Sequence, residues 1–211
     1  MKRAIVIGAS SGIGHEVARI LIMQGWTVGV AARRTEKLED LKNCAPERVF
    51  TAQIDVTNEK ADEALSQLAD QIGGLDLYFH AAGIGWKNPT LEPEKEMKTM
   101  QTNGLGFVRM VSEAYRYLAK HGGGHIVCIT SVAGTKGIGA IPAYSATKAM
   151  QNTYLQALEQ LAANNHLNIR FTDIRPGFVD TPLLSDSSHF PMLMKTERSE
   201  ERRVGKECRS R

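Results

Sequence analysis

The chain has little of what marks a secreted, metal-binding or membrane-spanning protein. Its 211 residues include only three cysteines, which form no paired framework and favour a reducing compartment. No segment approaches the roughly 18 consecutive apolar residues of a membrane span. The short apolar run after Met1, Lys2 and Arg3 is too brief for a secretory signal, and the scattered histidines predict no metal site. We expect a cytoplasmic protein, and the 42% apolar content suits one globular domain.

Net charge is also lacking once residues 198–211 are set aside. This string, R-S-E-E-R-R-V-G-K-E-C-R-S-R, holds six of the 26 Lys and Arg residues and three of the 23 Asp and Glu residues. The rest of the chain therefore carries 20 of each. The formal charge of +3 is thus no indication of nucleic-acid binding, and we expect no nucleic-acid partner.

The same string is charged throughout and has no apolar period. It resembles the in-frame translation of a common sequencing-adapter oligonucleotide, and such scars are excluded from fold reasoning. The alternative is a disordered basic tail that contacts nucleic acid. We therefore expect one C-terminally truncated domain over residues 1–197 and an artefactual, disordered tail over 198–211.

Short apolar runs alternate with helical patterns along the chain. Buried strands are expected at 4–7, 27–31, 49–54, 75–80, 124–130 and 168–174, and helices at 13–24, 35–43, 58–71, 94–119 and 144–165. The alternation predicts an α/β fold, a Rossmann-like doubly wound parallel sheet with helices on both faces in a single domain. Right-handed crossovers would place the loops after the strands at one edge, where ligands bind.

A glycine-rich turn, G-A-S-S-G-I-G, directly follows the first apolar run. Gly8 would permit a tight turn, Gly12 would let backbone N–H groups approach a pyrophosphate, and Gly14 would allow close helix packing. The spacing departs from G-x-G-x-x-G, and the alternative is a turn that merely needs glycine. We predict that a dinucleotide binds at Gly8, Ser10, Ser11, Gly12, Ile13 and Gly14.

Tyr144 and Lys148 lie four residues apart at the start of a helical pattern, and Tyr144 follows Ser131 by thirteen positions. A phenol is a poor base at neutral pH, because its reference pKa is about 10. A lysine one helical turn away could stabilise the phenolate. Tyr144 would then be a general acid/base, and the Ser131 hydroxyl would hold a carbonyl or alcohol oxygen. A solvated pair on the helix surface is the alternative.

Together these motifs resemble the short-chain dehydrogenase/reductase family in its compact form. The resemblance covers roughly residues 3–195 and rests on motifs in the family's order: G-A-S-S-G-I-G, Asp55, Ser131, Tyr144, Lys148 and P-G-F-V-D-T at 176–181. It implies an NAD(P)-dependent oxidoreductase that acts on a CH–OH group. The sequence departs from the family at His80 and Ala81, which stand where two asparagines usually provide hydrogen bonds.

The resemblance also implies roles for individual residues. Tyr144 would donate a proton to the developing alkoxide, with the substrate oxygen held by Ser131. Lys148 would lower the pKa of Tyr144 and bind the nicotinamide ribose. Asn103, within Q-T-N-G-L-G, would hold a water in a proton relay, and a local backbone contact is its alternative role.

The cofactor is predicted from the end of the second apolar run, where V-G-V-A-A-R-R-T has Ala32 in place of an acid. Guanidinium groups suit a 2′-phosphate, so NADP is expected over NAD, with Arg33 favoured over Arg34. Solvated arginines are the alternative. By resemblance, further cofactor contacts would come from Asp55, Val56, Ala82, Gly83, Asn103, Tyr144, Lys148, Pro176, Gly177, Val179 and Thr181. Among these, Thr181 would hold the carboxamide or serve only as a helix cap.

The substrate is predicted to be a small carbonyl or alcohol compound. An apolar wall is expected from Ile84, Trp86, Val132, Ile138, Ile141, Phe178, Leu183, Leu184 and Phe190, with Trp86 and Ile138 beside Ser131 and Tyr144. By resemblance, the chain would form a homodimer or homotetramer and would lack the family's C-terminal edge strand.

Two alternative functions remain at the level of the sequence. A non-catalytic dinucleotide-binding or regulatory protein could share the same fold. The intact set of Asn103, Ser131, Tyr144 and Lys148 favours the enzyme, because a pure binder needs no such set. A truncated, inactive product is the other alternative.

Overall fold

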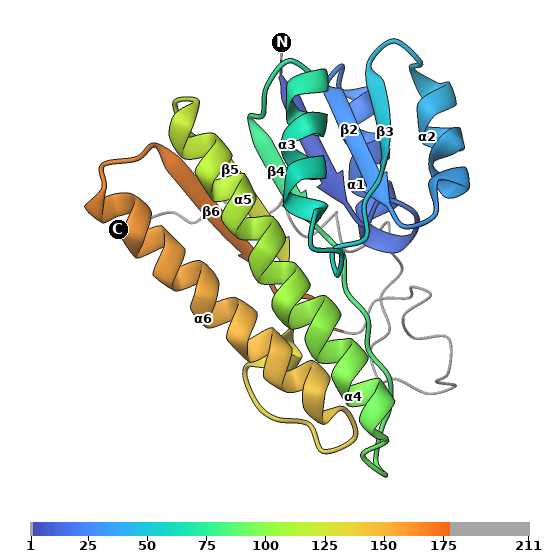
Figure 1. Ribbon diagram of the computed structural model, residues 1–211, viewed down its shortest axis with the longest axis vertical. Coiled ribbons are helices and arrows are strands. Elements are labelled where there is room, and N and C mark those ends of the chain that lie inside the picture. Colours follow the sequence, from blue (N-terminus) through green and yellow to red (C-terminus); the bar gives the residue numbers. More distant parts are fainter. Residues whose placement is uncertain (1, 178–211) are drawn as a thin grey trace.

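In the computed structural model, which describes residues 2–177, six strands form one fully parallel sheet (Figure 1). The strand order is β3-β2-β1-β4-β5-β6, so the winding reverses between β1 and β4. The strands are β1 Arg3–Ile7, β2 Thr27–Ala32, β3 Val49–Gln53, β4 Leu77–His80, β5 Gly124–Ile129 and β6 Ile169–Ile174. The predicted doubly wound parallel sheet is thereby confirmed.

Helices and helical turns connect the strands. The α-helices are α1 Gly12–Met23, α2 Glu39–Cys44, α3 Ala61–Gln71, α4 Pro93–Thr99, α5 Phe107–Lys120 and α6 Pro142–Asn164. Two short 3₁₀ turns are η1 Thr35–Leu38 and η3 Val132–Gly134, and η2 Met100–Gly106 is a π-helical turn. The helical pattern at 35–43 therefore divides into η1 and α2, and the helix expected over 94–119 contains a π-turn between α4 and α5.

The helix predicted from residue 58 begins three residues later, at Ala61. The Asp55 and Asn58 side chains accept hydrogen bonds from the backbone N–H groups of Thr57 and Lys60, each at 2.9 Å. Such bonds between a side chain and the backbone two residues on hold a turn and compete with helix formation. The segment after β3 is therefore a turn, and this keeps Asp55 at the edge of the sheet.

Two apolar layers cover the two faces of the sheet. On one face, α1 and α2 pack through Val17, Leu21 and Leu41 against β1 and β2. On the other, α3, α5 and α6 pack through side chains such as Leu68, Met110 and Leu155. Figure 1 shows the second layer in front of the sheet, with α5 and α6 side by side. These buried faces follow the expected amphipathic pattern of helices on a parallel sheet.

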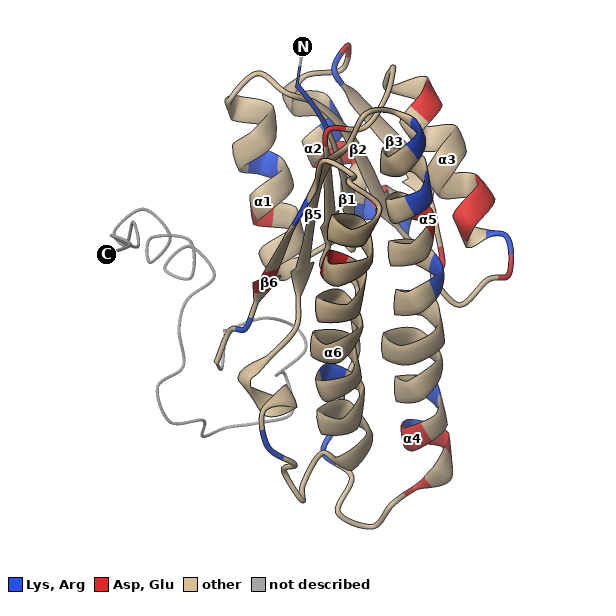
Figure 2. Cartoon of the chain, turned by 90° about the vertical axis from the view of Figure 1, so that its left-hand side faces the viewer, with Lys and Arg blue, Asp and Glu red and all other residues tan. Residues whose placement is uncertain are grey.

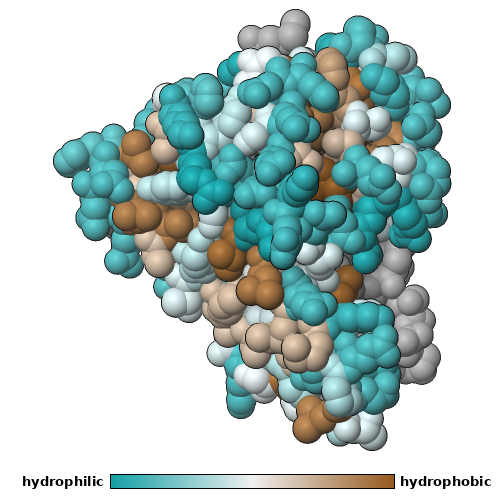
Figure 3. Space-filling model, in the orientation of Figure 1, coloured by the Kyte–Doolittle hydropathy of each residue, from teal (hydrophilic) through white to brown (hydrophobic). Residues whose placement is uncertain are grey.

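Charge is distributed unevenly over the helices. The only charged residues of the long helix α6 are Lys148 and Glu159, and Figure 2 shows it largely free of charge. The face in Figure 3 is mostly hydrophilic, with apolar groups interrupting it. Large apolar side chains are exposed at Met97, Met100, Leu105 and Leu161. In proportion to its length, α6 is therefore the least charged of the helices.

Within residues 2–177, the edges of the sheet are β3 and β6. Several expectations lie outside this range: the cofactor contacts Val179 and Thr181, the apolar residues Phe178, Leu183, Leu184 and Phe190, the domain limit at 197 and the tail 198–211. In the described range, no helix has the length and apolar character needed to cross a membrane.

Candidate active site

The predicted catalytic residues lie beyond the carboxyl ends of β4 and β5. Ser131 follows β5 and caps η3, where its hydroxyl oxygen accepts a hydrogen bond from Ala133 N at 3.1 Å. Tyr144 lies in the first turn of α6, which begins at Pro142, a residue favoured at a helix start. Burial raises the pKa of Tyr144, and hydrogen bonding to the Ser131 side chain acts in the opposite direction. The structure therefore brings the two predicted hydroxyls together.

Lys148 is also at the site, and it is 4% exposed. Its Nζ donates to the Ile129 carbonyl at 3.0 Å and to Gln151 Oε1 at 3.1 Å, and it lies 5.5 Å from the centre of the Tyr144 ring. Burial lowers the pKa of Lys148 to about 8, while Cys128 and Asp173 act in the opposite direction. From the sequence, Lys148 was expected to lower the pKa of Tyr144. In this structure burial of the phenol outweighs any such effect.

Asn103 lies in the π-turn η2 and has no solvent exposure. Its Oδ1 accepts from Ile84 N at 2.9 Å, and its Nδ2 donates to Ile84 O at 2.7 Å. The Asn103 backbone carbonyl accepts from Gln151 Nε2 at 2.8 Å. The Asn103 side chain thus makes a local backbone contact, which was its alternative role, and the holding of a relay water stays a prediction. Local widening of a helix into a π-turn is frequent at functional sites.

The glycine loop occupies the turn between β1 and α1. Gly8 has φ +86°, and a Cβ there would lie 2.7 Å from the Ala82 backbone nitrogen, so only glycine suits this position. The amide groups of Gly8 and Ala9 both donate to Ala31 O, at 2.9 and 3.2 Å. Ser11 precedes α1 without making a side-chain capping bond. The loop therefore presents the N-terminus of α1 toward the end of β4, where Ala82 and Gly83 follow.

The other predicted cofactor residues surround this loop at the same edge. Arg33 and Arg34 follow β2 with exposed side chains. Asp55 follows β3, and its carboxylate accepts from Thr57 N and Oγ1 at 2.9 and 2.7 Å. Val56 is 5% exposed, and its carbonyl accepts from the Arg109 guanidinium at 2.9 Å. The structure thus places the predicted residues at consecutive strand ends, with Asp55 engaged in a local turn.

The segment after β6 returns to Ser131. Val132 N donates to Pro176 O at 3.2 Å, so Pro176 and Gly177 lie next to η3. Of the two apolar residues predicted beside Ser131 and Tyr144 at the substrate, Ile138 is 39% exposed in the loop before α6 and Trp86 is half-buried in the segment after β4. The loop containing Ile138 is tied to α6 through a hydrogen bond from Ile138 N to Ser145 Oγ at 3.2 Å.

Two residues that shape the site were not predicted from the sequence. Gly85 lies against the phenol, because a Cβ there would be 2.6 Å from Tyr144 Cδ2. Gln151 is fully buried and bonded to both Lys148 and Asn103. Helical spacing could have indicated Gln151, because positions 144, 148 and 151 share one face of a helix. A single sequence gives no comparable signal for Gly85.

A buried polar cluster also anchors the segment after β4. Asn88 is 1% exposed, and its Nδ2 donates to Glu96 Oε1 at 2.7 Å. The other carboxylate oxygen of Glu96 accepts from Ala143 N at 3.1 Å, next to Tyr144. Glu96 therefore connects α4 with the first turn of α6, where a negative charge is favourable.

His80, at the end of β4, replaces one of the expected asparagines. Its Nδ1 is hydrogen-bonded to Tyr78 OH at 2.8 Å, and the Phe107 ring packs edge-on against it. Its Nε2 is buried without a hydrogen-bond partner in the described part of the chain. Burial, followed by the charge of Lys148, lowers the pKa of His80 to about 3. His80 is therefore neutral at physiological pH.

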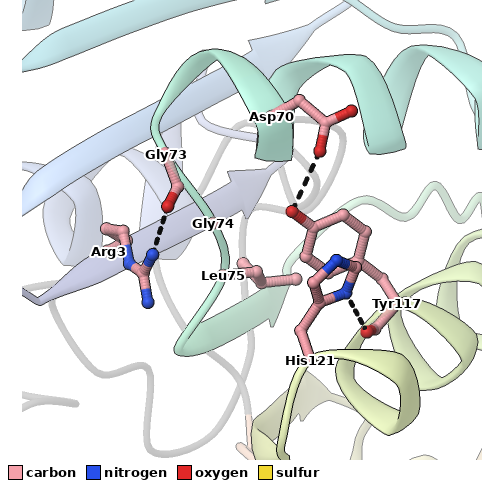
Figure 4. Close-up of a pocket in the computed structure, with 7 residues that line it drawn as sticks. All are labelled: Arg3, Asp70, Gly73, Gly74, Leu75, Tyr117 and His121. Carbon is pink, nitrogen blue, oxygen red and sulfur yellow. Dashed lines mark hydrogen bonds between the residues drawn. The ribbon is translucent and has the colours of Figure 1, made fainter.

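A separate hollow of about 350 Å³ lies at the other end of the sheet, near the start of β1 (Figure 4). Its polar groups bond to one another or to the backbone: Tyr117 OH donates to Asp70 at 3.0 Å, and His121 Nδ1 lies 2.7 Å from Tyr117 O. Arg3 pairs with Asp76, with Nη2 and Oδ1 2.8 Å apart. This hollow is distant in the fold from Tyr144, and its contacts join β1, α3 and α5.

The fold and the arrangement of the site match one family of oxidoreductases. The chain belongs to the short-chain dehydrogenase family, whose model matches residues 2–191. It is 32% identical over 203 residues to an uncharacterized oxidoreductase of Mycobacterium tuberculosis, covering 92% of this chain and 79% of that protein. The resemblance in the sequence is thereby confirmed.

Two solved structures show the same fold. The alcohol dehydrogenase of Thermococcus sibiricus, complexed with 5-hydroxy-NADP, has a TM-score of 0.81 and 26% identity over 97% of this chain and 89% of that one. A serine dehydrogenase complexed with NADP+ in its closed form has a TM-score of 0.80 and 25% identity over 96% and 88% of the two chains. The oxidoreductase class and the Rossmann-like fold are therefore established for this chain.

Proposed function

We propose that the chain is an NADP(H)-dependent oxidoreductase that interconverts a carbonyl and an alcohol. The observation that carries the proposal is the convergence of Ser131, Tyr144 and Lys148 beyond the end of β5, on the edge that also holds the glycine loop. Ligands of doubly wound sheets bind in the crevice at this edge. A set of hydroxyl, phenol and buried ammonium groups matches proton transfer to a substrate oxygen.

The residues at the loop fit a dinucleotide. The positive φ of Gly8 and its close approach to Ala82 keep the loop thin, while the N-terminus of α1 offers backbone donors to a pyrophosphate. When bound, the cofactor would supply or accept the hydride. Lys148 would bind its nicotinamide ribose, and Pro176 and Gly177 would line the nicotinamide side together with Val179 and Thr181.

In the proposed mechanism, the protein residues handle the substrate oxygen and its proton. The Ser131 and Tyr144 hydroxyls hold the carbonyl oxygen of the substrate. Tyr144 gives its proton to the developing alkoxide during reduction and removes that proton during oxidation. The positive charge of Lys148 stabilises the phenolate that forms on Tyr144. The N-terminal end of α6 also favours the negative charge of this phenolate.

We assign the cofactor preference to the exposed pair Arg33 and Arg34 after β2. Ala32 stands where an acidic residue would bind a ribose 2′-hydroxyl, and guanidinium groups suit a 2′-phosphate. Two structurally similar enzymes were solved with NADP+ and 5-hydroxy-NADP, which supports this choice over NAD. By resemblance, Asp55 and Val56 would contact the adenine.

The substrate would be a small carbonyl or alcohol compound that reaches Tyr144 between Trp86 and Ile138.

We place the enzyme in the cytoplasm, because Cys44 and Cys128 are free cysteines. The surface of α6 has Glu159 as its one exposed charge, and together with exposed apolar side chains such as Leu161 it supports a homodimer or homotetramer formed through α4–α5 and α6. Neither a nucleic acid nor a membrane is among the proposed partners.

A non-catalytic dinucleotide-binding protein remains the second candidate on this fold. A buried lysine with a lowered pKa beside a partly buried tyrosine with a raised pKa favours catalysis, because such shifts cluster at functional sites. A binding protein would have no use for them. Turnover with a panel of carbonyl compounds separates the two candidates.

Thermal unfolding of the chain with NADPH and with NADH tests the cofactor proposal. A ligand that binds only the folded state raises the melting temperature, so NADPH should act at a much lower concentration than NADH. In Arg33→Ser this difference should shrink, whereas Arg170→Ser, which changes an exposed arginine near the start of β6, should keep it. Stabilisation by neither dinucleotide would contradict the proposal.

A further inference from the structure

Gln151 is an unusual residue in this site because its amide is entirely buried and is hydrogen-bonded through both its oxygen and its nitrogen. It lies on α6, three residues after Lys148, with 0% exposure. Its Oε1 accepts from Lys148 Nζ at 3.1 Å, and its Nε2 donates to the Asn103 carbonyl at 2.8 Å. A buried amide with both groups bonded is fixed in position. The side chain therefore connects α6 to the π-turn η2.

The orientation of this amide follows from its partners. The Asn103 carbonyl is only an acceptor, so the NH₂ group of Gln151 must face it, and the oxygen remains for the lysine. Asn103 is fixed in turn by its two hydrogen bonds to the Ile84 backbone. A continuous path of hydrogen bonds thus runs from the end of β4 through η2 to the Lys148 ammonium group.

We propose that Gln151 is a positioning residue that holds the Lys148 ammonium group in place and favours its charged form beside Tyr144. A hydrogen bond from an ammonium group to a neutral oxygen is stronger than one from a neutral amine, so the acceptor favours protonation. The proposal rests on the proposed function, in which the charge of Lys148 supports proton transfer by Tyr144.

The surroundings of Lys148 make this acceptor important. Burial lowers the pKa of Lys148 to about 8, and Cys128 on β5 and Asp173 on β6 act in the opposite direction. The other titratable groups facing it are Tyr144 on α6 and the neutral His80 on β4. The Asp173 carboxylate is already bonded to Arg175 Nε at 2.6 Å and to the Thr130 hydroxyl. Direct contacts to the ammonium therefore come from neutral oxygens, one of which belongs to Gln151.

The same contacts involve Asn103, which by resemblance would hold a water in a proton relay. Here an amide side chain links the Asn103 carbonyl to Lys148 directly. An amide N–H is far too weak an acid to relay protons at neutral pH, so this link transmits position and not protons.

The test measures the pKa of Lys148 without cofactor or substrate, by ¹³C NMR of the lysine Cε resonances between pH 6 and 10. The Lys148 signal is assigned as the one missing in Lys148→Met. Gln151→Glu should raise the midpoint by about one pH unit, because it places a carboxylate beside the ammonium. Gln151→Met should lower it, because the acceptor is lost. Gln156→Glu, an exposed change on the same helix, should leave it unchanged.

Opposite shifts in two variants would support the proposal, since a merely structural defect would not move the midpoint in both directions. The near-isosteric Gln151→Glu keeps the test informative if Gln151→Met unfolds. An unchanged Lys148 midpoint in the folded variants would overturn the proposal, whether or not the chain has activity. In an active chain, the pH profile of turnover should shift in the same directions. If the Lys148 midpoints shift as expected but the chain transfers no hydride, the proposed function is overturned and the positioning role of Gln151 stands.

Discussion

The two ends of the parallel sheet both carry clusters of polar residues, yet the clusters have different character. At the amino end, Arg3 and Asp76 form a bidentate pair whose side chains are 32% and 41% exposed. At the carboxyl end, Lys148 is buried among neutral oxygens and Tyr144 is partly buried beside it. The first cluster satisfies its charges locally, and the second holds ionisable groups away from water.

We interpret the cluster at the amino end as one that stabilises the fold, and the cluster at the carboxyl end as one that supports proton transfer. An exposed ion pair stabilises a fold by up to about 1 kcal/mol and leaves the charge of its members unchanged near neutral pH. A buried lysine with a pKa of about 8 is costly to keep, and such groups are concentrated where proton transfer needs them. The comparison predicts that mutations at the carboxyl end change activity most and those at the amino end change stability alone.

The largest expected effect comes from Tyr144→Phe. The change removes the only proposed proton donor while keeping the ring that packs on Gly85. Turnover should fall by several orders of magnitude, because the proton transfer step loses its acid and base. NADPH affinity and melting temperature should stay close to those of the unmodified chain. Steady-state kinetics and cofactor titration measure both, and normal turnover would contradict the mechanism.

A smaller loss of activity is expected from Gly85→Ala. The added Cβ would lie 2.6 Å from Tyr144 Cδ2, so the phenol must move. A displacement of this kind near reacting atoms can lower turnover by about 100-fold. Gly139→Ala is the matched control, because a Cβ added at Gly139 would have no neighbouring atom within 4 Å. Equal activity of the two variants would show that the position of Tyr144 does not depend on Gly85.

Much of the fold followed from the sequence, because buried parallel strands are short apolar runs and each is separated from the next by a helical pattern. All six strands were predicted within a few residues, and β4 is the least accurate because Leu75 and Asp76 precede it. The π-turn at η2 was not predicted, because no local pattern marks it, and the contacts of Asn103 within it are tertiary bonds to the backbone of Ile84, 19 residues away.

The positions of the candidate site residues could be predicted from the spacing of the motifs. The environment of their side chains could not, because it depends on tertiary contacts. Ser131, Tyr144 and Lys148 converge as expected because strand ends and helix starts meet at one edge. The pKa of Tyr144 was expected to fall through its neighbour Lys148, but burial of the phenol raises it. Burial depends on packing by distant segments, among them Gly85, and no local pattern encodes it.

An intermediate effect, on stability, is expected from His80→Asn at the carboxyl end. The pKa of His80 is about 3 in the folded state, against about 6.5 when unfolded, so between these values the unfolded state binds the extra proton. The unmodified chain should therefore lose up to about 1.4 kcal/mol of stability per pH unit as the pH falls below 6.5. Urea unfolding at several pH values should give a shallower dependence for His80→Asn. The exposed His166→Asn should keep the original slope.

The smallest effect is expected at the amino end, from Asp76→Asn. Hydrogen bonds from Arg3 hold the pKa of Asp76 below its usual value, so its stabilisation is present above the unfolded pKa of about 3.9 and is lost as the pH falls through the lower folded value. Because the pair is partly exposed, the change should cost only about 1 kcal/mol at pH 7. Turnover and the affinity for NADPH should remain unchanged, since Arg3 and Asp76 lie at the opposite end of the strands from Tyr144. Urea unfolding and kinetics on the same sample measure both. A loss of activity larger than the loss of folded protein would mean that the two ends of the sheet are coupled, and the division between a stabilising end and a chemical end would be wrong.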